Sequence, residues 1–152
     1  MKVSSRGEYA LRALLVLGQS GSRILSVGEV AEKTLVPVSY LEQILLQLKV
    51  LGYVKSKRGV QGGYALLLPP EQINIGEVIR KLEGPLAPMS CASVTAYEPC
   101  QLEADCLLKP LWTLVRDTVA HVLDQTSLAD LLEQRIRLKD GGDYYVTVRS
   151  NP

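Results

Sequence analysis

The sequence lacks any segment that would carry the chain into or across a membrane. Its first residues contain no long apolar run followed by an A-x-A cleavage pattern, which is the signature of a secretory leader. No apolar run reaches the roughly 18 residues that a membrane-spanning helix needs. We therefore expect a cytoplasmic protein that does not associate with a membrane.

Cysteine and histidine are scarce. The chain has three cysteines, an odd number clustered between Cys91 and Cys106, so they do not form the disulfide framework of a small secreted domain. They lack the C-x2-C spacing of a zinc knuckle, and the one histidine, His121, lies beyond the cluster. The cysteines therefore indicate reduced thiols or ligands of a metal other than zinc.

Signs of catalysis are missing as well. The sequence contains no C-x-x-C pair, no paired carboxylates in a recognisable pocket motif, and no glycine-rich phosphate loop after a buried strand. We therefore do not expect an enzyme.

What the chain does have is an uneven distribution of charge. At 152 residues and 47% hydrophobic, it can bury a core in one domain. Residues 1–68 contain nine Lys/Arg against four Asp/Glu, whereas residues 69–135 contain five against ten. This asymmetry predicts an amino-terminal half that faces nucleic acid, attached to an acidic regulatory half.

The basic half is predicted to form a helix, a short helix, a turn, a third helix and a β-hairpin. Each helix is expected to begin at a capping box, in which a serine hydroxyl and a glutamate carboxylate satisfy the first free N–H groups. The three pairs are Ser5 with Glu8, Ser26 with Glu29, and Ser39 with Glu42. This order of elements is that of a winged helix-turn-helix.

The third helix, expected from Ser39 to Gly52, has one apolar face for the core and a polar face that is suited to reading DNA. Gln43 and Gln47 suit adenine edges, and Tyr40 suits a phosphate or a thymine methyl group. Glu42, more to the side, suits cytosine. The candidate DNA-binding residues of this helix are Ser39, Tyr40, Glu42, Gln43 and Gln47.

Residues 53–58 and 64–68 are predicted to be the two strands of the wing, joined by the glycine-rich turn 59–63. Lys55, Lys57 and Arg58 suit phosphate contacts beside Gly59, and Arg58 suits insertion into a minor groove. A second interpretation is that these cations are a solvated strand edge that prevents aggregation.

The acidic half is predicted to contain three further helices around a long loop. Asn74 and Glu77 cap a fourth helix, and Pro110 opens a long helix whose apolar stripe is too long for the winged domain to cover. That helix is therefore expected to pair with its copy in a homodimer. Thr126 and Ser127 cap a short last helix. Residues 136–139 and 144–148 form either a terminal hairpin or a frayed tail.

These predictions combine into one architecture, a mainly α protein with a small β-wing. A winged helix-turn-helix domain occupies residues 1–84, and a cysteine-bearing cluster loop occupies residues 85–106. A dimerisation helix and a short final helix follow in residues 107–135, and residues 136–152 form the tail.

The cysteines follow the pattern Cys91-x8-Cys100-x5-Cys106 within a loop of no sustained periodicity. Thiolates on such a loop suit an iron–sulfur cluster, although three of them leave one coordination position open. Surface cysteines without a cofactor are an equally good interpretation of the spacing alone.

Several motifs together resemble the Rrf-type winged-helix transcription regulators, the group that contains IscR and NsrR, over residues 1–133. They are Ser5-Arg6-Gly7-Glu8-Tyr9-Ala10, Ser39-Tyr40-Leu41-Glu42-Gln43, Arg58-Gly59 with Gly62-Gly63-Tyr64, Gly76-Glu77-Val78-Ile79, and Leu111-Trp112 with Leu128-Ala129-Asp130-Leu131. The resemblance implies a homodimer whose long helices cross at the interface. It also implies an iron–sulfur cluster, two-iron or four-iron, on Cys91, Cys100 and Cys106.

The chain departs from that family pattern at two points. The first cysteine interval is longer than the usual x5, and Lys109 stands where many members have a histidine ligand. Some relatives complete the cluster with an acidic side chain from the first helix of the partner subunit, and Glu8 occupies the matching position. Glu8 is thus either the fourth ligand or only the cap of its own helix.

The predicted function is a homodimeric regulator that binds double-stranded DNA at a pseudo-palindromic operator. Its operator affinity would be controlled by the cluster, in response to iron, redox state or nitric oxide. The alternative is a cofactor-free winged-helix regulator that is controlled by a protein partner or by cysteine oxidation.

Overall fold

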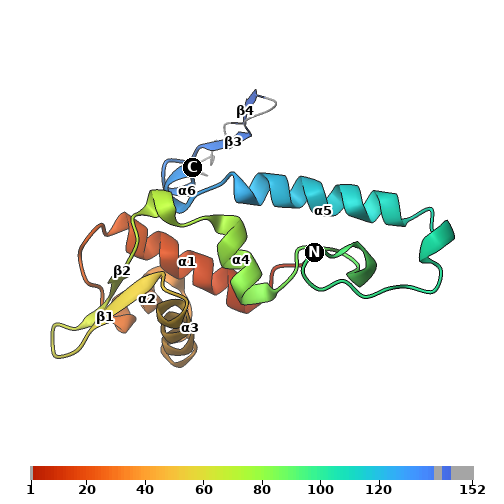
Figure 1. Cartoon of the computed structure of the whole chain (residues 1–152). Coiled ribbons are helices and arrows are strands. Elements are labelled where there is room, and N and C mark those ends of the chain that lie inside the picture. Colours follow the sequence, from red (N-terminus) through yellow and green to blue (C-terminus); the bar gives the residue numbers. More distant parts are fainter. Residues whose placement is uncertain (1, 139–141, 145–152) are drawn as a thin grey trace.

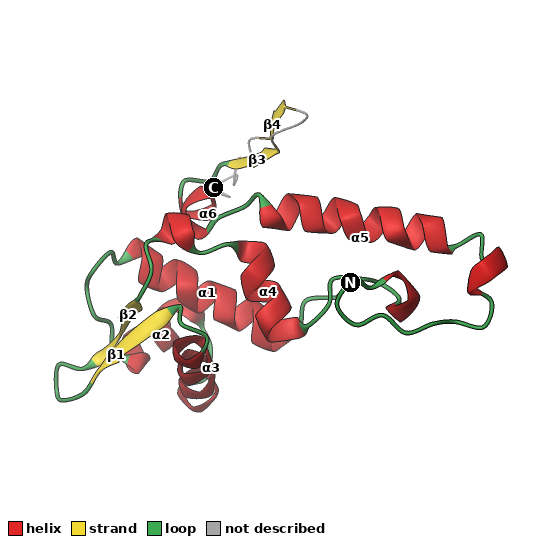
Figure 2. Ribbon diagram, in the orientation of Figure 1, coloured by secondary structure: helices red, strands yellow, loops and turns green. Residues whose placement is uncertain are grey.

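The computed structural model describes residues 2–138 and 142–144, and Figures 1 and 2 show a winged-helix domain from which one long helix extends. The helices are α1 Ser5–Gln19, α2 Val27–Thr34, α3 Val38–Val50, α4 Ile75–Glu83, α5 Lys109–Asp124 and α6 Leu128–Leu132. The strands are β1 Val54–Lys57, β2 Gly63–Leu66, β3 Ile136–Leu138 and β4 Gly142–Tyr144. Short 3-10 turns lie at Pro70–Gln72, Ser90–Ala92 and Glu103–Asp105. The predicted mainly α fold with a small β-wing is confirmed.

The core of the winged domain forms where the apolar faces of α1, α2, α3 and α4 meet, joined by the start of α6. The face of α3 that was predicted to be buried is buried, except that Leu51 is only partly covered. The largest fully buried side chains are Leu14, Leu17, Leu25, Leu41, Ile44, Leu45, Leu48, Ile73 and Leu128. Burial of such side chains contributes about 1.5–3 kcal/mol each before the entropy cost of folding, and it fixes α3 with its other face outward.

The predicted start of α1 is wrong by one residue. Ser4, not Ser5, is the N-cap, and its hydroxyl oxygen accepts a hydrogen bond from the N–H of Gly7 at 3.1 Å. The Ser4 hydroxyl also donates to the carboxylate of Glu83 at 2.6 Å. This contact with the end of α4 favours Ser4 over the adjacent serine, so the Ser5–Glu8 capping box does not form.

The predicted start of α3 is also wrong, because the N-cap is Pro37 and not Ser39. The helix begins at Val38 after Pro37, whose carbonyl oxygen accepts the N–H groups of Tyr40 and Leu41 at 3.1 and 2.9 Å. No side chain caps this end, so the predicted Ser39–Glu42 capping box is absent. Proline already fixes the backbone at the entrance to the helix, which removes the need for a serine cap.

The capping box of Ser26 and Glu29 at α2 is confirmed, and so is the wing. β1 pairs antiparallel with β2, with Val54 opposite Leu66 and Lys57 opposite Gly63. The strands are shorter than predicted, because Arg58 lies outside the ladder. An isolated bridge between Leu25 and Tyr64 attaches the wing to the chain just before α2.

The carboxy-terminal elements begin at α4, which Asn74 caps by accepting the N–H of Glu77 at 3.0 Å. Ser127 and Asp130 form a capping box at α6, as the predicted helix start there requires. β3 and β4 form a terminal hairpin in which Ile136 lies opposite Tyr144. The second strand begins earlier than predicted, and residues 145–148 lie outside the described part of the chain. None of the described helices is long and apolar enough to cross a membrane.

Candidate nucleic-acid interface and cysteine loop

The outward face of α3 is turned slightly from the predicted one. Ser39, Glu42 and Gln43 are exposed, as a reading face requires. Gln47 is not: it is half-buried, and its Oε1 is buried without a hydrogen-bond partner. Leu46 instead is 57% exposed on this face. Four residues of a helix turn through about 400°, which is slightly more than one full turn. Gln43 and Gln47, four residues apart, therefore point in different directions and are not equally exposed.

Tyr40 also differs from the prediction, because it belongs partly to the core. Its ring meets the ring of Tyr9 edge to face, with 5.7 Å between the centroids. The side chain is half-buried. Such a contact holds the start of α3 against α1, so Tyr40 acts as an anchor for the helix.

The wing presents its cations to solvent. Lys55, Lys57, Arg58 and Gly59 are all exposed, and the turn is closed by the N–H of Gly62, which donates to the carbonyl of Gly59 at 2.9 Å. Gly59 has a φ of +109°, which a side chain would make unfavourable. The backbone at this turn is therefore free to approach a phosphate closely.

Lys49, which the sequence did not single out, joins α3 to the wing. The Nζ of Lys49, in the last turn of α3, donates to the Oγ of Ser56 in β1 at 2.6 Å. A groove of about 380 Å³ lies at this junction, and its lining includes Lys49, Ser56, Lys57 and Arg58. A sign of this contact in the sequence is Ser56, a polar residue between Lys55 and Lys57 of the wing. The groove gathers cations from α3 and the wing in one place, as phosphate binding requires.

The three cysteines are free thiols on the loop between α4 and α5. Cys91 lies in the turn Ser90–Ala92 and is half-buried, as is Cys106, whereas Cys100 is exposed. Among the described residues, no group of three His, Cys, Asp or Glu side chains is placed to hold a metal ion. The thiols therefore have the chemistry for a cluster, but the described loop does not bring three of these donors together.

A carboxylate occupies the middle of this loop. Glu103 accepts hydrogen bonds from the Tyr97 hydroxyl at 2.8 and 3.0 Å and from the N–H of Cys100 at 3.3 Å, and it forms an ion pair with Lys109. The Lys109 ammonium, followed by the Tyr97 hydroxyl, holds the pKa of the Glu103 carboxyl below its usual value. The same carboxylate raises the pKa of Lys109 and that of Tyr97.

Glu8, the other candidate ligand, is exposed near the start of α1 and forms an ion pair with Arg12 one turn later. Because Ser4 caps α1 by itself, Glu8 has no capping role. Its carboxylate is accessible from outside the chain.

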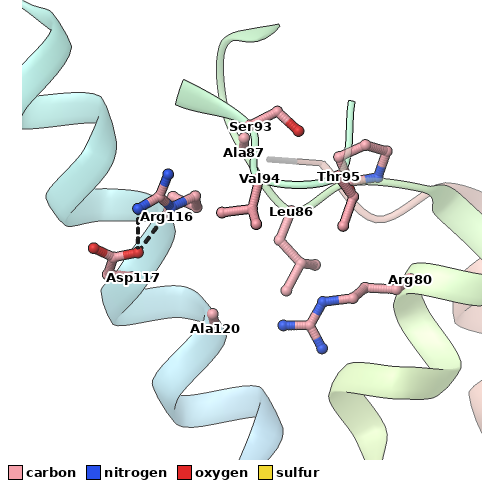
Figure 3. A pocket seen from close by; sticks show the side chains of 10 residues that line it. Arg80, Leu86, Ala87, Ser93, Val94, Thr95, Arg116, Asp117 and Ala120 are labelled. Carbon is pink, nitrogen blue, oxygen red and sulfur yellow. Dashed lines mark hydrogen bonds and ion pairs between the residues drawn. The ribbon is translucent and has the colours of Figure 1, made fainter. Parts of the chain in front are cut away.

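The start of the cysteine loop packs between the winged domain and α5. A small cavity of about 100 Å³ lies there. Figure 3 shows Arg80 of α4 and Arg116 of α5 among the side chains that line it. Arg116 donates to the carbonyl of Ala92 at 2.6 Å, beside Cys91. Arg80 binds both carboxylate oxygens of Asp124, at 2.5 and 2.8 Å, which raises the pKa of Arg80. The loop backbone beside Cys91 is therefore hydrogen-bonded to α5, and α5 is in turn paired with α4.

α5 carries the apolar stripe that the sequence predicted, and none of its residues is buried within the single chain. Figures 1 and 2 show this helix reaching away from the winged domain. Leu111 and Leu114 are 48% and 64% exposed, and Leu107 just before the helix is 92% exposed. Such a row of leucines is the kind of surface that a second chain covers.

Comparison with known proteins places this architecture among transcription regulators. The model of the Rrf2 family, described as iron-dependent transcriptional regulator, matches residues 3–134. An rrf2-like HTH-type transcriptional regulator of Rhodobacter capsulatus is 36% identical over 137 residues, which cover 86% of this chain and 91% of the relative.

Two solved structures have similar folds and different names, CymR and IscR. CymR, the global cysteine regulator of B. subtilis, matches with a TM-score of 0.73 and 35% identity, over 88% of this chain and 97% of CymR. IscR of T. potens matches with a TM-score of 0.68 and 33% identity, over 88% of this chain and 87% of IscR.

Proposed function

The chain belongs to the Rrf2 family and is a DNA-binding transcription regulator; from this premise we propose that it acts as a homodimer whose operator affinity is set by an iron–sulfur cluster. The observation that carries the proposal is the set of three free cysteines on the loop between α4 and α5. Thiolates are the donors that iron–sulfur clusters take, whether two-iron or four-iron. Cys91, Cys100 and Cys106 are the proposed ligands.

The fourth ligand we propose is Glu8 of the partner subunit. Two facts support it: Ser4 leaves Glu8 without a capping role, and the remaining contact is an exposed ion pair with Arg12. An exposed pair of this kind contributes little to stability, so the carboxylate can exchange its partner at small cost.

The DNA interface consists of α3 and the wing. Gln43 is the side chain best placed to read an adenine edge, with Glu42 beside it as a second base contact. Lys57 and Arg58 contact phosphates or the minor groove, and Lys49 extends the basic surface onto α3. With two such heads related by a two-fold axis, the operator is pseudo-palindromic, with its half-sites about one helical turn apart.

The signal passes from the loop to the reading heads through α4 and α5. The loop contacts α5 through Arg116, and α4 is held to α5 by the Arg80–Asp124 pair. A cluster that fits one separation of the two heads better than another would favour that separation. Coupling of about 1–3 kcal/mol is typical and corresponds to a change of roughly 5- to 150-fold in DNA affinity.

A second candidate is a cofactor-free regulator that responds to a protein partner or to cysteine oxidation. Two observations favour it. The described residues place no three metal-binding side chains together, and one similar structure is that of a cysteine regulator. Cys100, exposed on the loop, is the thiol that oxidation would reach first.

The test compares Cys100→Ala, Glu8→Ala and Arg12→Ala with the wild type. For each protein, iron and sulfide content, dimer mass and operator affinity are measured without oxygen. We expect the first two variants to lose or destabilise the cluster, to shift operator affinity in the same direction and to remain dimers. Arg12→Ala is the matched control, because it removes the partner of Glu8 and leaves the carboxylate.

The possible outcomes separate the parts of the proposal. A normal cluster in Glu8→Ala would show that the fourth ligand is another group. Unchanged operator affinity in Cys100→Ala, where the wild type holds its cluster, would refute the switch. A wild type that takes up neither iron nor sulfide would favour the cofactor-free candidate.

A further inference from the structure

Three side chains of the cysteine loop form a closed set of contacts, which we call the loop latch: Tyr97, Glu103 and Lys109. The Glu103 carboxylate accepts the Tyr97 hydroxyl at 2.8 and 3.0 Å and pairs with the Lys109 ammonium. The ammonium also lies 5.8 Å from the centre of the Tyr97 ring. Each member thus contacts both of the others, so the latch is a cooperative unit and not a single ion pair.

The latch holds each of the segments that separate the cysteines. Tyr97 lies between Cys91 and Cys100, Glu103 between Cys100 and Cys106, and Lys109 follows Cys106. Backbone contacts tighten it further, because the Glu103 carboxylate accepts the N–H of Cys100 at 3.3 Å and the Glu103 carbonyl accepts the N–H of Cys106 at 3.3 Å.

Cys100 and Cys106 are thus both hydrogen-bonded to Glu103, the central residue of the latch, so a change in their separation disturbs that residue.

The latch explains why the three cysteine thiols lie on one loop but are not brought together. The three thiols are not placed together to hold a metal ion in the described part of the chain. The side-chain charges of the latch are only partly covered, with 19% of the Glu103 side chain and 34% of the Lys109 side chain exposed. Contacts of that kind are strong enough to select one loop conformation and weak enough to be broken by a ligand.

We propose that the loop latch stabilises the cluster-free form of the cysteine loop and that loading of the cysteines requires it to open. The proposal deepens the proposed function and rests on it for the identity of the cluster. Because Lys109 is the first residue of α5, opening of the latch frees the start of the helix that we assign to the dimer interface. The state of the loop is thereby linked to that interface.

The latch can be tested on the protein without iron. The rate at which iodoacetamide alkylates each cysteine is measured by mass spectrometry on the reduced full-length protein. Glu103→Gln and Lys109→Met each remove one charge of the latch. We expect alkylation of the half-buried Cys91 and Cys106 to accelerate by about 3- to 10-fold, the factor that the loss of one hydrogen-bonded contact gives. Cys100 is already exposed, so its alkylation rate should change less than theirs.

Two controls exclude a general loosening of the fold. Glu98→Gln removes a charge from an exposed residue of the same loop outside the latch, and its rates should match those of the wild type. The exchange variant Glu103→Lys with Lys109→Glu restores an ion pair and should return the rates toward wild type. Equal acceleration in Glu98→Gln, or no recovery in the exchange variant, would overturn the latch.

Cluster loading is then measured separately on the same variants under anaerobic reconstitution. The proposal expects Glu103→Gln and Lys109→Met to take up iron and sulfide faster than the wild type, and to retain them longer against a chelator. If the wild type takes up the cluster and both variants take it up and release it at the wild-type rates, the latch is refuted and the proposed function stands. If the alkylation results hold but no variant takes up iron, the latch stands and the cluster assignment fails.

Discussion

Replacing Gly63 by alanine should break the contact between the wing and the chain segment just before α2. An added Cβ would lie 2.0 Å from the carbonyl oxygen of Leu25 and 2.9 Å from the amide nitrogen of Ser26, both of them backbone atoms. Backbone cannot rotate aside as a flexible side chain can, so the wing must move by about 1 Å or more. The φ of +153° at Gly63 adds strain for any residue with a side chain.

The expected cost follows from the contacts that such a movement breaks. Leu25 and Tyr64 exchange two backbone hydrogen bonds, at 2.8 and 2.9 Å, next to a fully buried leucine side chain. Two hydrogen bonds contribute about 0.5–1.5 kcal/mol each, and an overpacked site costs about 1–3 kcal/mol. We therefore expect the free energy of unfolding to fall by about 2–6 kcal/mol, with weaker operator binding because the wing cations lose their position.

Urea denaturation followed by circular dichroism measures the first effect, and titration of an operator fragment measures the second. Gly28→Ala is the matched control, since its added Cβ meets no atom closer than 3.9 Å. Alanine is the better helix former, so this change in α2 should leave stability equal or raise it by up to about 1 kcal/mol. A Gly63→Ala protein within about 0.5 kcal/mol of wild type, with normal operator affinity, would refute the argument.

The remaining predictions concern reading, stability and assembly. Gln43→Ala should lose discrimination at particular base pairs by about 1–3 kcal/mol, while Lys57→Ala should weaken all sequences alike and lower the salt slope by about one; equal effects on every sequence would exclude α3 as the reader. Leu35 is 86% exposed and has a φ of +57°, a conformation that asparagine adopts more readily than leucine. Leu35→Asn should therefore raise the free energy of unfolding in urea by about 0.5–1 kcal/mol, and a lower value than that of the wild type would contradict the strain at this position. Leu114→Glu should give monomers in sedimentation, and unchanged dimers would place the interface elsewhere.

The sequence predicted the winged helix-turn-helix because its signals are local. Leu41, Ile44, Leu45 and Leu48 repeat at helical spacing, and the structure buries all four. The exposed stripe of α5 was predictable for the same reason: a helix that needs cover shows its apolar face in sequence, whichever chain supplies the cover.

Helix starts were less predictable because two adjacent residues can serve as the cap. Ser4 was not distinguishable from Ser5 until the contact with Glu83, 79 residues away in the sequence, was known. The exposure of Gln47 was mistaken for a similar reason. One step along a helix turns a side chain by about 100°, and packing around α3 decides which side of that step is covered.

The arrangement of the cysteine loop was the least predictable part. Its two departures from the family pattern, the lengthened first interval and Lys109, turn out to supply two of the three latch residues, since Tyr97 lies in that interval. These contacts join side chains six residues apart in a segment without periodicity. No helical or strand spacing indicates such contacts, so they emerge only from the folded loop.

The most direct test of cluster control compares one protein preparation with itself. Operator affinity is measured without oxygen, at a single salt concentration, before and after the iron–sulfur cluster is removed by a chelator, with iron and sulfide counted in the same sample. The account predicts a difference in affinity of roughly 5- to 150-fold between the two forms, and no such difference in Cys100→Ala. Equal affinities of the loaded and the stripped protein, or a colourless protein without iron or sulfide after reconstitution, would contradict it.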